Sequence, residues 1–113
     1  MKVERSDRDG VVVLALEGEF DSFETDAVAS AFQSCIDEGA NRIALDCEKL
    51  LFVNSTTIAF LIRAQKTSQG HGGEIVIARP RDFIHKTLET LGLGQIFRMT
   101  GTLDEAIALL ASP

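Results

Sequence analysis

The sequence predicts an α/β protein with a mixed, mostly parallel central sheet of about five strands and about four surrounding helices. Two observations predict this class: short runs rich in valine and isoleucine alternate with segments of helical periodicity, and turn signals separate them. The chain has 113 residues, of which 45% are hydrophobic, which is enough for one core. It shows no internal repeat and no low-complexity segment. We therefore expect a single domain over residues 1–113.

The first part of the chain is expected to form a hairpin followed by a helix. Residues 2–5 and 11–17 have the composition of strands, and the pair Asp9-Gly10 between them is a common hairpin turn signal. Over residues 22–38, apolar side chains recur at three- and four-residue spacing, and a glycine follows as a stop signal. An antiparallel pair therefore opens the chain, and an amphipathic helix follows it.

The rest of the chain is expected to alternate strands with helices. Strands are predicted at residues 42–47, with an extension at 50–53, at 74–78, and briefly at 96–99. Helices are predicted at residues 55–68, from Pro80 to about Leu91 with Gly92 as the cap, and at 102–112. The last of these begins with Thr102 and has Glu105 three residues later, which is the pattern of a capping box.

A cluster of hydroxyl side chains marks the junction between a predicted strand and a predicted helix. Ser55, Thr56 and Thr57 follow Asn54, and side-chain oxygens there can accept hydrogen bonds from the free N–H groups of the first helical turn. One cap needs one residue, which we assign to Ser55 or to the Asn54 amide. The surplus hydroxyl of Thr56 suggests a phosphate acceptor, because a phosphate suits the positive end of the helix dipole. Capping alone is the alternative.

Phe60 is apolar on the wrong side of its predicted helix. Ile58, Leu61, Ile62 and Gln65 share the face that we expect to pack on the sheet, and Phe60 points away from it. The ring therefore either packs under a neighbouring helix or contacts a partner protein.

Composition argues against several classes of function. The net charge of −6 and the lack of a basic patch argue against nucleic acid as a partner. No apolar run approaches the roughly 20 residues that span a bilayer, so we expect a cytoplasmic protein without a membrane partner. Cys35 and Cys47 are expected to be buried free thiols, and His71 and His85 have no partner at a catalytic or metal-binding spacing. We therefore expect no enzymatic activity, no metal and no cofactor.

Three segments, in order, resemble the STAS domain family, in particular its small stand-alone anti-sigma factor antagonists. LEGEFD at residues 16–21 is similar to the family's signature after the second strand. IALDCEKLLFVNSTT at residues 43–57 resembles the strand, aspartate and apolar run before the family's Asp-Ser-Ser-Gly phosphorylation motif. GGEIVIARPRDFIHKTLETLGLGQIF at residues 72–97 is similar to the later strand and helix.

The resemblance implies a mixed sheet with helices around it and a regulatory function without enzymatic activity. It implies that the unphosphorylated protein binds an anti-sigma factor, a serine kinase of the histidine-kinase-like ATPase fold, and thereby frees a sigma factor. Phosphorylation of the motif's second hydroxyl ends that binding, and a serine/threonine phosphatase restores it. A non-switching STAS scaffold or ligand-sensing module, as a homodimer or a larger assembly, is the alternative.

Position by position, the resemblance implies the following site. Asn54 matches the motif's aspartate, Ser55 its first serine, Thr56 the phosphoacceptor and Thr57 the glycine, while Asp21 matches an early-loop aspartate near the partner surface. Asn54 and Thr57 depart from the motif, since one lacks the carboxylate and the other adds a branched side chain. We expect phosphorylation at Thr56, with Ser55 as the second choice. Partner contacts are expected at Asp21, Asn54, Ser55, Thr57 and Phe60.

Overall fold

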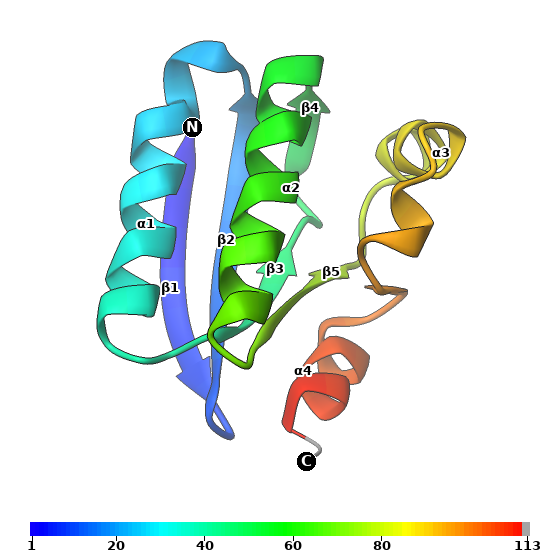
Figure 1. Ribbon diagram of the computed structural model, residues 1–113. Helices are drawn as coiled ribbons and strands as arrows, with labels where there is room; N and C mark the ends of the chain where they lie inside the picture. Colours follow the sequence, from blue (N-terminus) through cyan, green and yellow to red (C-terminus); the bar gives the residue numbers. More distant parts are fainter. Residues whose placement is uncertain (112–113) are drawn as a thin grey trace.

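A six-stranded mixed sheet forms the centre of the protein in a computed structural model that describes residues 1–111 (Figure 1). The strands are β1 (Lys2–Arg8), β2 (Val11–Phe20), β3 (Arg42–Asp46), β4 (Leu50–Val53), β5 (Glu74–Ala78) and β6 (Met99–Thr100). The order is β1-β2-β3-β5-β6, and β4 pairs with β2 beyond the end of β3. Only β1 and β2 are antiparallel. The predicted class is confirmed, with one strand more than expected.

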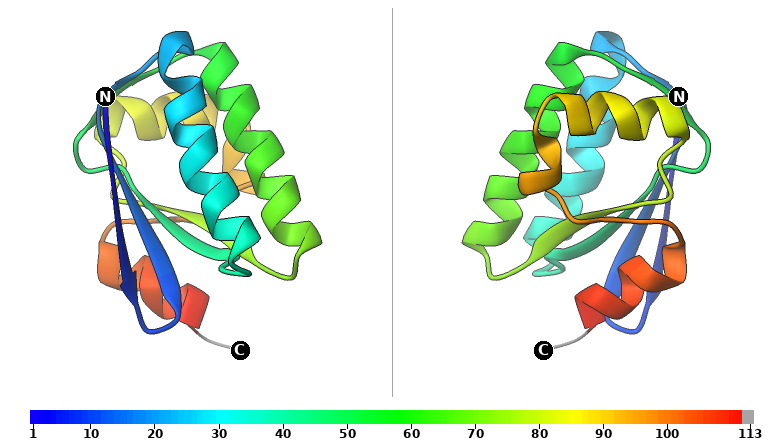
Figure 2. Two further views of the ribbon diagram at one scale, coloured as in Figure 1. Left: turned by 90° about the vertical axis from the view of Figure 1, so that its left-hand side faces the viewer. Right: turned by 90° about the vertical axis from the view of Figure 1, so that its right-hand side faces the viewer.

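Four α-helices cover the two faces of the sheet (Figure 2). They are α1 (Thr25–Asp37), α2 (Ser55–Gly70), α3 (Asp82–Thr90) and α4 (Leu103–Ala111), with two short 3-10 turns, η1 (Ser22–Glu24) and η2 (Leu93–Gln95). Helices α1, α2 and α3 pack on one face, and α4 packs on the other. Residue 112, the last of the predicted final helix, lies outside the described residues.

Strict alternation along the strands divides the core into two layers. Val12, Leu14 and Leu16 of β2 join the larger cluster under α1 to α3, while Val11 and Val13 join the smaller cluster under α4. The same alternation occurs in β3 and β5, because successive side chains of a strand point to opposite faces. A sheet covered on both faces therefore explains the nearly continuous apolar strands of the sequence.

A buried glutamine joins α2 to the sheet. Gln65 is 1% exposed; its Nε2 donates to the carbonyls of Ile75 (3.1 Å) and Ile96 (3.0 Å), and its Oε1 accepts from the N–H of Ile75 (2.7 Å). Strand β6 pairs with β5 only at Ile77 and Ala78, so no strand covers the backbone of Ile75 on that side. The glutamine amide takes the place of the missing strand partner.

Several predicted boundaries were wrong. The first two strands extend to Arg8 and Phe20, and the first helix begins as the 3-10 turn η1. Helix α3 starts at Asp82 instead of Pro80, because Arg81 is still extended as its N-cap. The last strand is Met99–Thr100 instead of 96–99, because the N–H groups of residues 96 and 97 bond to Leu93 within the η2 turn and are lost to the sheet.

Candidate functional site

The candidate site lies at the end of the sheet where β2 and β4 terminate. Strand β2 pairs with β3 as far as Ala15 and with β4 from Gly18 onward. The β2–β4 register shifts between Gly18 and Glu19, and the φ of 104° at Gly18 is open to glycine but strained for other residues. Phe20 and Val53 are the last register partners of the two parallel strands. Asp21 and Asn54 follow them directly, after the ends of β2 and β4, which lie at the upper end of the molecule in Figure 1.

Two side-chain hydrogen bonds connect the predicted residues at this end. The Asp21 carboxylate accepts the N–H of Phe23 (3.0 Å) and thereby caps η1. The Asn54 Nδ2 donates to the Ser22 Oγ at 3.2 Å, which links the start of α2 to the η1 turn. The structure therefore ties Asp21 and Asn54 separately to the same η1 turn, and Ser22 is a contact residue there that the sequence analysis missed.

Asn54 and Thr57 form the cap of α2. The Asn54 Oδ1 accepts the N–H of Thr57 (3.0 Å), and the Thr57 Oγ1 in turn accepts the N–H of Asn54 (3.0 Å), a reciprocal capping box. Of the two caps considered, Asn54 is correct and Ser55 is not. Thr57 is fully buried, so it has no exposed atom with which to touch a docked protein and acts through the cap instead.

Ser55 and Thr56 are left exposed on the first turn of α2. Neither hydroxyl makes a hydrogen bond within residues 1–111. The first turn carries no acidic residue, so nothing on the helix itself offsets the positive end of its dipole. Both hydroxyls are therefore accessible to a modifying enzyme, and neither is needed to begin the helix.

Replacing Thr57 with valine is expected to lower the free energy of unfolding by about 1–2 kcal/mol, because the isosteric side chain fills the same buried space without the hydroxyl of the capping box. Urea unfolding measures the change. Ser55→Ala is the control and should stay within about 0.5 kcal/mol of the parent, as exposed substitutions away from caps do. Equal losses in the two variants would contradict the assignment of the cap.

Phe60 lies half-buried between α1 and α2. Its ring contacts Phe20 edge-on (centroids 6.2 Å apart) and Phe32 at a tilt (5.9 Å). This geometry matches the first of the two alternatives, packing under a neighbouring helix. The part of the side chain that remains exposed lines a groove between α1 and α2. That a partner contacts the exposed part of the Phe60 side chain stays a prediction.

Phe23 is an exposed aromatic residue that the sequence analysis missed. The side chain is 94% exposed on the η1 turn, between Ser22, which bonds to Asn54, and Glu24. A signal was present in the sequence, because a phenylalanine between polar neighbours at the predicted start of a helix falls outside the apolar periodicity of residues 28–36. Large exposed aromatic side chains beside a polar site are typical of protein-binding surfaces.

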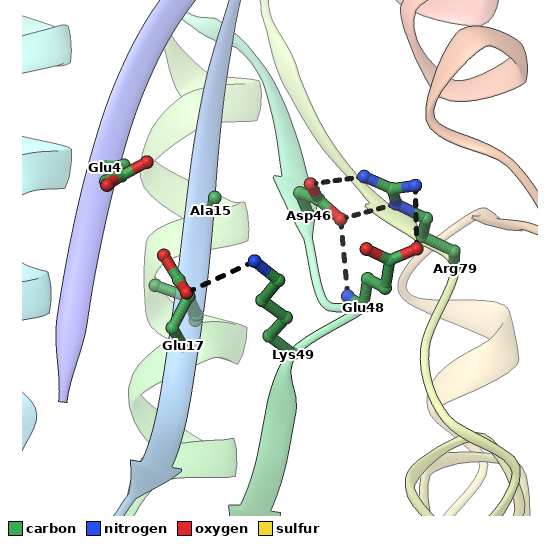
Figure 3. A pocket seen from close by; sticks show the side chains of 8 residues that line it. Glu4, Ala15, Glu17, Asp46, Glu48, Lys49 and Arg79 are labelled. Atoms are coloured by element: carbon green, nitrogen blue, oxygen red, sulfur yellow. Dashed lines mark hydrogen bonds and ion pairs between the residues drawn. The ribbon is translucent and has the colours of Figure 1, made fainter.

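A charged hollow of about 160 Å³ lies over β1 and β2, next to the end of β3 and the chain that follows β5 (Figure 3). Arg79, whose φ is 43°, donates from Nε and Nη2 to the two oxygens of Asp46 (2.8 and 3.0 Å) and from Nη1 to Glu48 (2.9 Å). Burial pushes the pKa of Asp46 up, but the hydrogen bonds from Arg79 and from the Glu48 N–H outweigh it and hold the pKa below its usual value. Asp46 thus serves as the anchor of the chain between β5 and α3.

The remaining reactive side chains include the two cysteines and the residue types that bind metals. Cys35 and Cys47 are free and buried as predicted, and burial raises the pKa of Cys47 to about 12, which keeps it a thiol. Among residues 1–111, no group of three or more His, Cys, Asp or Glu side chains is placed to hold a metal ion. None of the helices in this part of the chain is both long and apolar enough to cross a membrane.

The fold and the site together define a small α/β domain whose candidate site is a helix start at the edge of a mixed sheet. The profile of the STAS domain family matches residues 2–106. The chain therefore belongs to the STAS domain family.

Relatives of the chain are similar over nearly their whole length. A candidate anti-sigma factor antagonist of Bordetella bronchiseptica, BtrV, is 22% identical over 108 residues, which cover 96% of this chain and 93% of BtrV. A candidate anti-sigma factor antagonist of Thermotoga maritima has the same fold, with a TM-score of 0.90 at 19% identity over 97% of this chain and 95% of that one. The Bacillus protein SpoIIAA, in its phosphorylated form, gives 0.74 at 23% identity over 95% and 97%.

Proposed function

We propose that the protein is an anti-sigma factor antagonist that binds an anti-sigma factor kinase and releases it when Thr56 is phosphorylated. The observation that carries the proposal is the exposed hydroxyl of Thr56 on the first turn of α2, which Asn54 ties to the η1 turn, and its freedom from any role in the cap. The names of the relatives support antagonism, and SpoIIAA, which shares the fold, has been observed in a phosphorylated form.

The start of α2 suits a phosphate. The N–H of Thr57 is engaged by Asn54, and the first turn holds no carboxylate that would repel a phosphate. A phosphate on Thr56 would bring a charge of about −1.5 to −2 to the positive end of the helix dipole. Phosphorylation is therefore expected to leave the fold intact and to act on the surface that a partner contacts.

The surface around this helix start supports a protein partner. Phe23 offers an aromatic anchor of the kind that dominates binding energy, and the nearby chain carries the acidic residues Glu19, Asp21 and Glu24, the last paired with the N-terminus. A partner with a basic rim around an apolar pocket would complement this surface. A phosphate on Thr56 adds charge and bulk beside the same contact and thereby favours release.

The proposed cycle needs two enzymes and one target. The anti-sigma factor kinase supplies the phosphoryl group, a serine/threonine phosphatase removes it, and the sigma factor that the kinase otherwise holds becomes free to act in transcription. The cycle would run in the cytoplasm, where sigma factors work, and the antagonist would contribute binding and not catalysis. Phosphorylation at Ser55 instead of Thr56 would cause release of the kinase in the same way, from the neighbouring position.

Intact-mass measurement with site mapping, on protein purified from its native host with and without phosphatase treatment, tests the proposal. We expect one phosphate on Thr56. The cognate kinase, captured on the unmodified protein, should bind Thr56→Ala about as well as the parent and Thr56→Glu at least about tenfold more weakly, which is a loss of about 1.4 kcal/mol.

Ser30→Glu is the matched control, because it adds the same charge at an exposed position of α1 and should leave binding unchanged. Protein that carries no phosphate under several growth conditions, together with unchanged binding by Thr56→Glu, would overturn the switch. The non-switching scaffold would then be favoured, since the two residues that depart from the motif, Asn54 and Thr57, both serve the cap. Light scattering would show its concentration-dependent assembly.

A further inference from the structure

A half-open groove of about 170 Å³ runs between α1 and α2, away from the helix start that carries Thr56. Its walls are the facing stripes of the two helices, with Phe32 and Ile36 on α1 and Phe60 and Ala64 on α2. The tilted pair of Phe32 and Phe60 forms an aromatic wall. An engineered apolar cavity of about 150 Å³ in another protein holds one benzene molecule, so this groove has the size of a single ring.

Two polar side chains, Ser68 and Arg63, favour one orientation of a ligand in the groove. Ser68 is 1% exposed, lines the groove, and its Oγ has no hydrogen-bond partner within residues 1–111. A buried hydroxyl without a partner costs about 1–3 kcal/mol, so a ligand that supplies the missing hydrogen bond gains from it. The position lies two helical turns from Phe60, or about 12 Å along the axis of α2.

Arg63 is the one charged residue among those that line the groove. Its side chain is exposed, and its guanidinium makes no ion pair in the part of the chain that the structure describes. A lone cation beside an apolar groove, in a protein whose net charge is −6, favours an anionic ligand over a cationic one.

We propose that this groove binds a small aromatic carboxylate that carries a hydrogen-bonding group at the opposite end of its ring. The ring packs against Phe32 and Phe60, the carboxylate pairs with Arg63, and the distal polar group meets the hydroxyl of Ser68. The proposal does not depend on the phosphorylation of Thr56, because Thr56 does not line the groove.

Titration of the isotope-labelled protein with three matched probes, followed by NMR, tests this site. We expect 4-hydroxybenzoate to shift the amides of α1 and α2 that line the groove and to saturate. Benzoate, which lacks the hydroxyl, and phenol, which lacks the carboxylate, should each bind about three- to tenfold more weakly, as the loss of one hydrogen bond or exposed ion pair implies.

Single substitutions in the groove test each proposed contact with the probe separately. Ser68→Ala should remove the advantage of 4-hydroxybenzoate over benzoate, and Arg63→Gln should remove its advantage over phenol. Lys66→Gln is the matched control, since it removes the same charge from an exposed position of α2 that does not line the groove. Ala64→Met should block the binding of all three probes by filling the groove.

Three results would overturn the proposal. The first is shifts that do not saturate or that map outside α1 and α2. The second is equal weakening by Lys66→Gln and Arg63→Gln, which would indicate attraction by general charge. The third is concentration-dependent broadening of the groove signals without any probe, which would mean that a second copy of the chain occupies the groove.

Discussion

Replacing Gln65 with leucine is expected to lower the free energy of unfolding by about 2–4 kcal/mol, although the new side chain is more hydrophobic. The glutamine amide makes three hydrogen bonds to the backbone of Ile75 and Ile96 inside the protein. Leucine would leave those backbone groups buried without partners, and each such group costs about 1–3 kcal/mol. The apolar surface that leucine buries offsets only part of this loss.

Urea unfolding monitored by circular dichroism measures the effect of Gln65→Leu. Gln69→Leu is the matched control, because this glutamine lies one turn further along α2, is exposed and makes no side-chain hydrogen bond in residues 1–111. The control should change stability by no more than about 0.5 kcal/mol. A Gln65 variant as stable as the control would show that the amide is dispensable and that the β5 edge finds other partners.

Replacing Gly73 with alanine is expected to cost at least about 3 kcal/mol, or to prevent folding altogether. A Cβ at this position would overlap the carbonyl group of Asn41, which is backbone and cannot rotate away. The same Asn41 carbonyl accepts the N–H of Glu74 at 3.0 Å, so any shift that relieves the overlap also breaks the hydrogen bond at the start of β5. Overpacking against backbone is among the most destabilising of substitutions.

Gly70→Ala controls for the loss of a glycine as such. A Cβ on Gly70, the last residue of α2, meets no atom within 4 Å, so this variant should be neutral or stabilised by about 0.5–1 kcal/mol. Thermal unfolding of the two variants gives the comparison directly. Similar melting temperatures would contradict the close approach of Gly73 to Asn41.

The sequence predicted the fold where periodicity was strong and failed where the chain changes direction. The strand from residue 11 is recognisable from its continuous valine-rich run, which a sheet covered on both faces requires, and the buried face of α2 from its three- to four-residue spacing. The predicted start of α3 at Pro80 was wrong. A proline marks the first helical position only when the next residue is also helical, and Arg81 is extended. Phe97, which follows the η2 turn, is 2% exposed, and no local pattern in the sequence indicates the turn.

The sequence placed the cluster of polar side chains at the start of a helix, which the structure shows, but it did not assign which of them caps the helix. Local sequence shows that polar side chains gather at a helix start, yet which of them caps the helix depends on where each side chain points once β4 has paired with β2. Thr57 is a mediocre helix former, and its side chain turns inward to complete the cap. Ser22 was missed because its contact with Asn54 spans 32 residues of chain, whereas Phe23 did carry a signal, as an aromatic residue outside the apolar periodicity of the first helix.

The capping box has a consequence for how this protein can evolve. Because Asn54 and Thr57 alone secure the start of α2, positions 55 and 56 are released from selection for stability and can drift between serine, threonine, alanine and acidic residues. Under the proposed switch, gene duplication and one substitution each would produce sister proteins that ignore the kinase, or that behave as if permanently phosphorylated, without passing through a poorly folded ancestor.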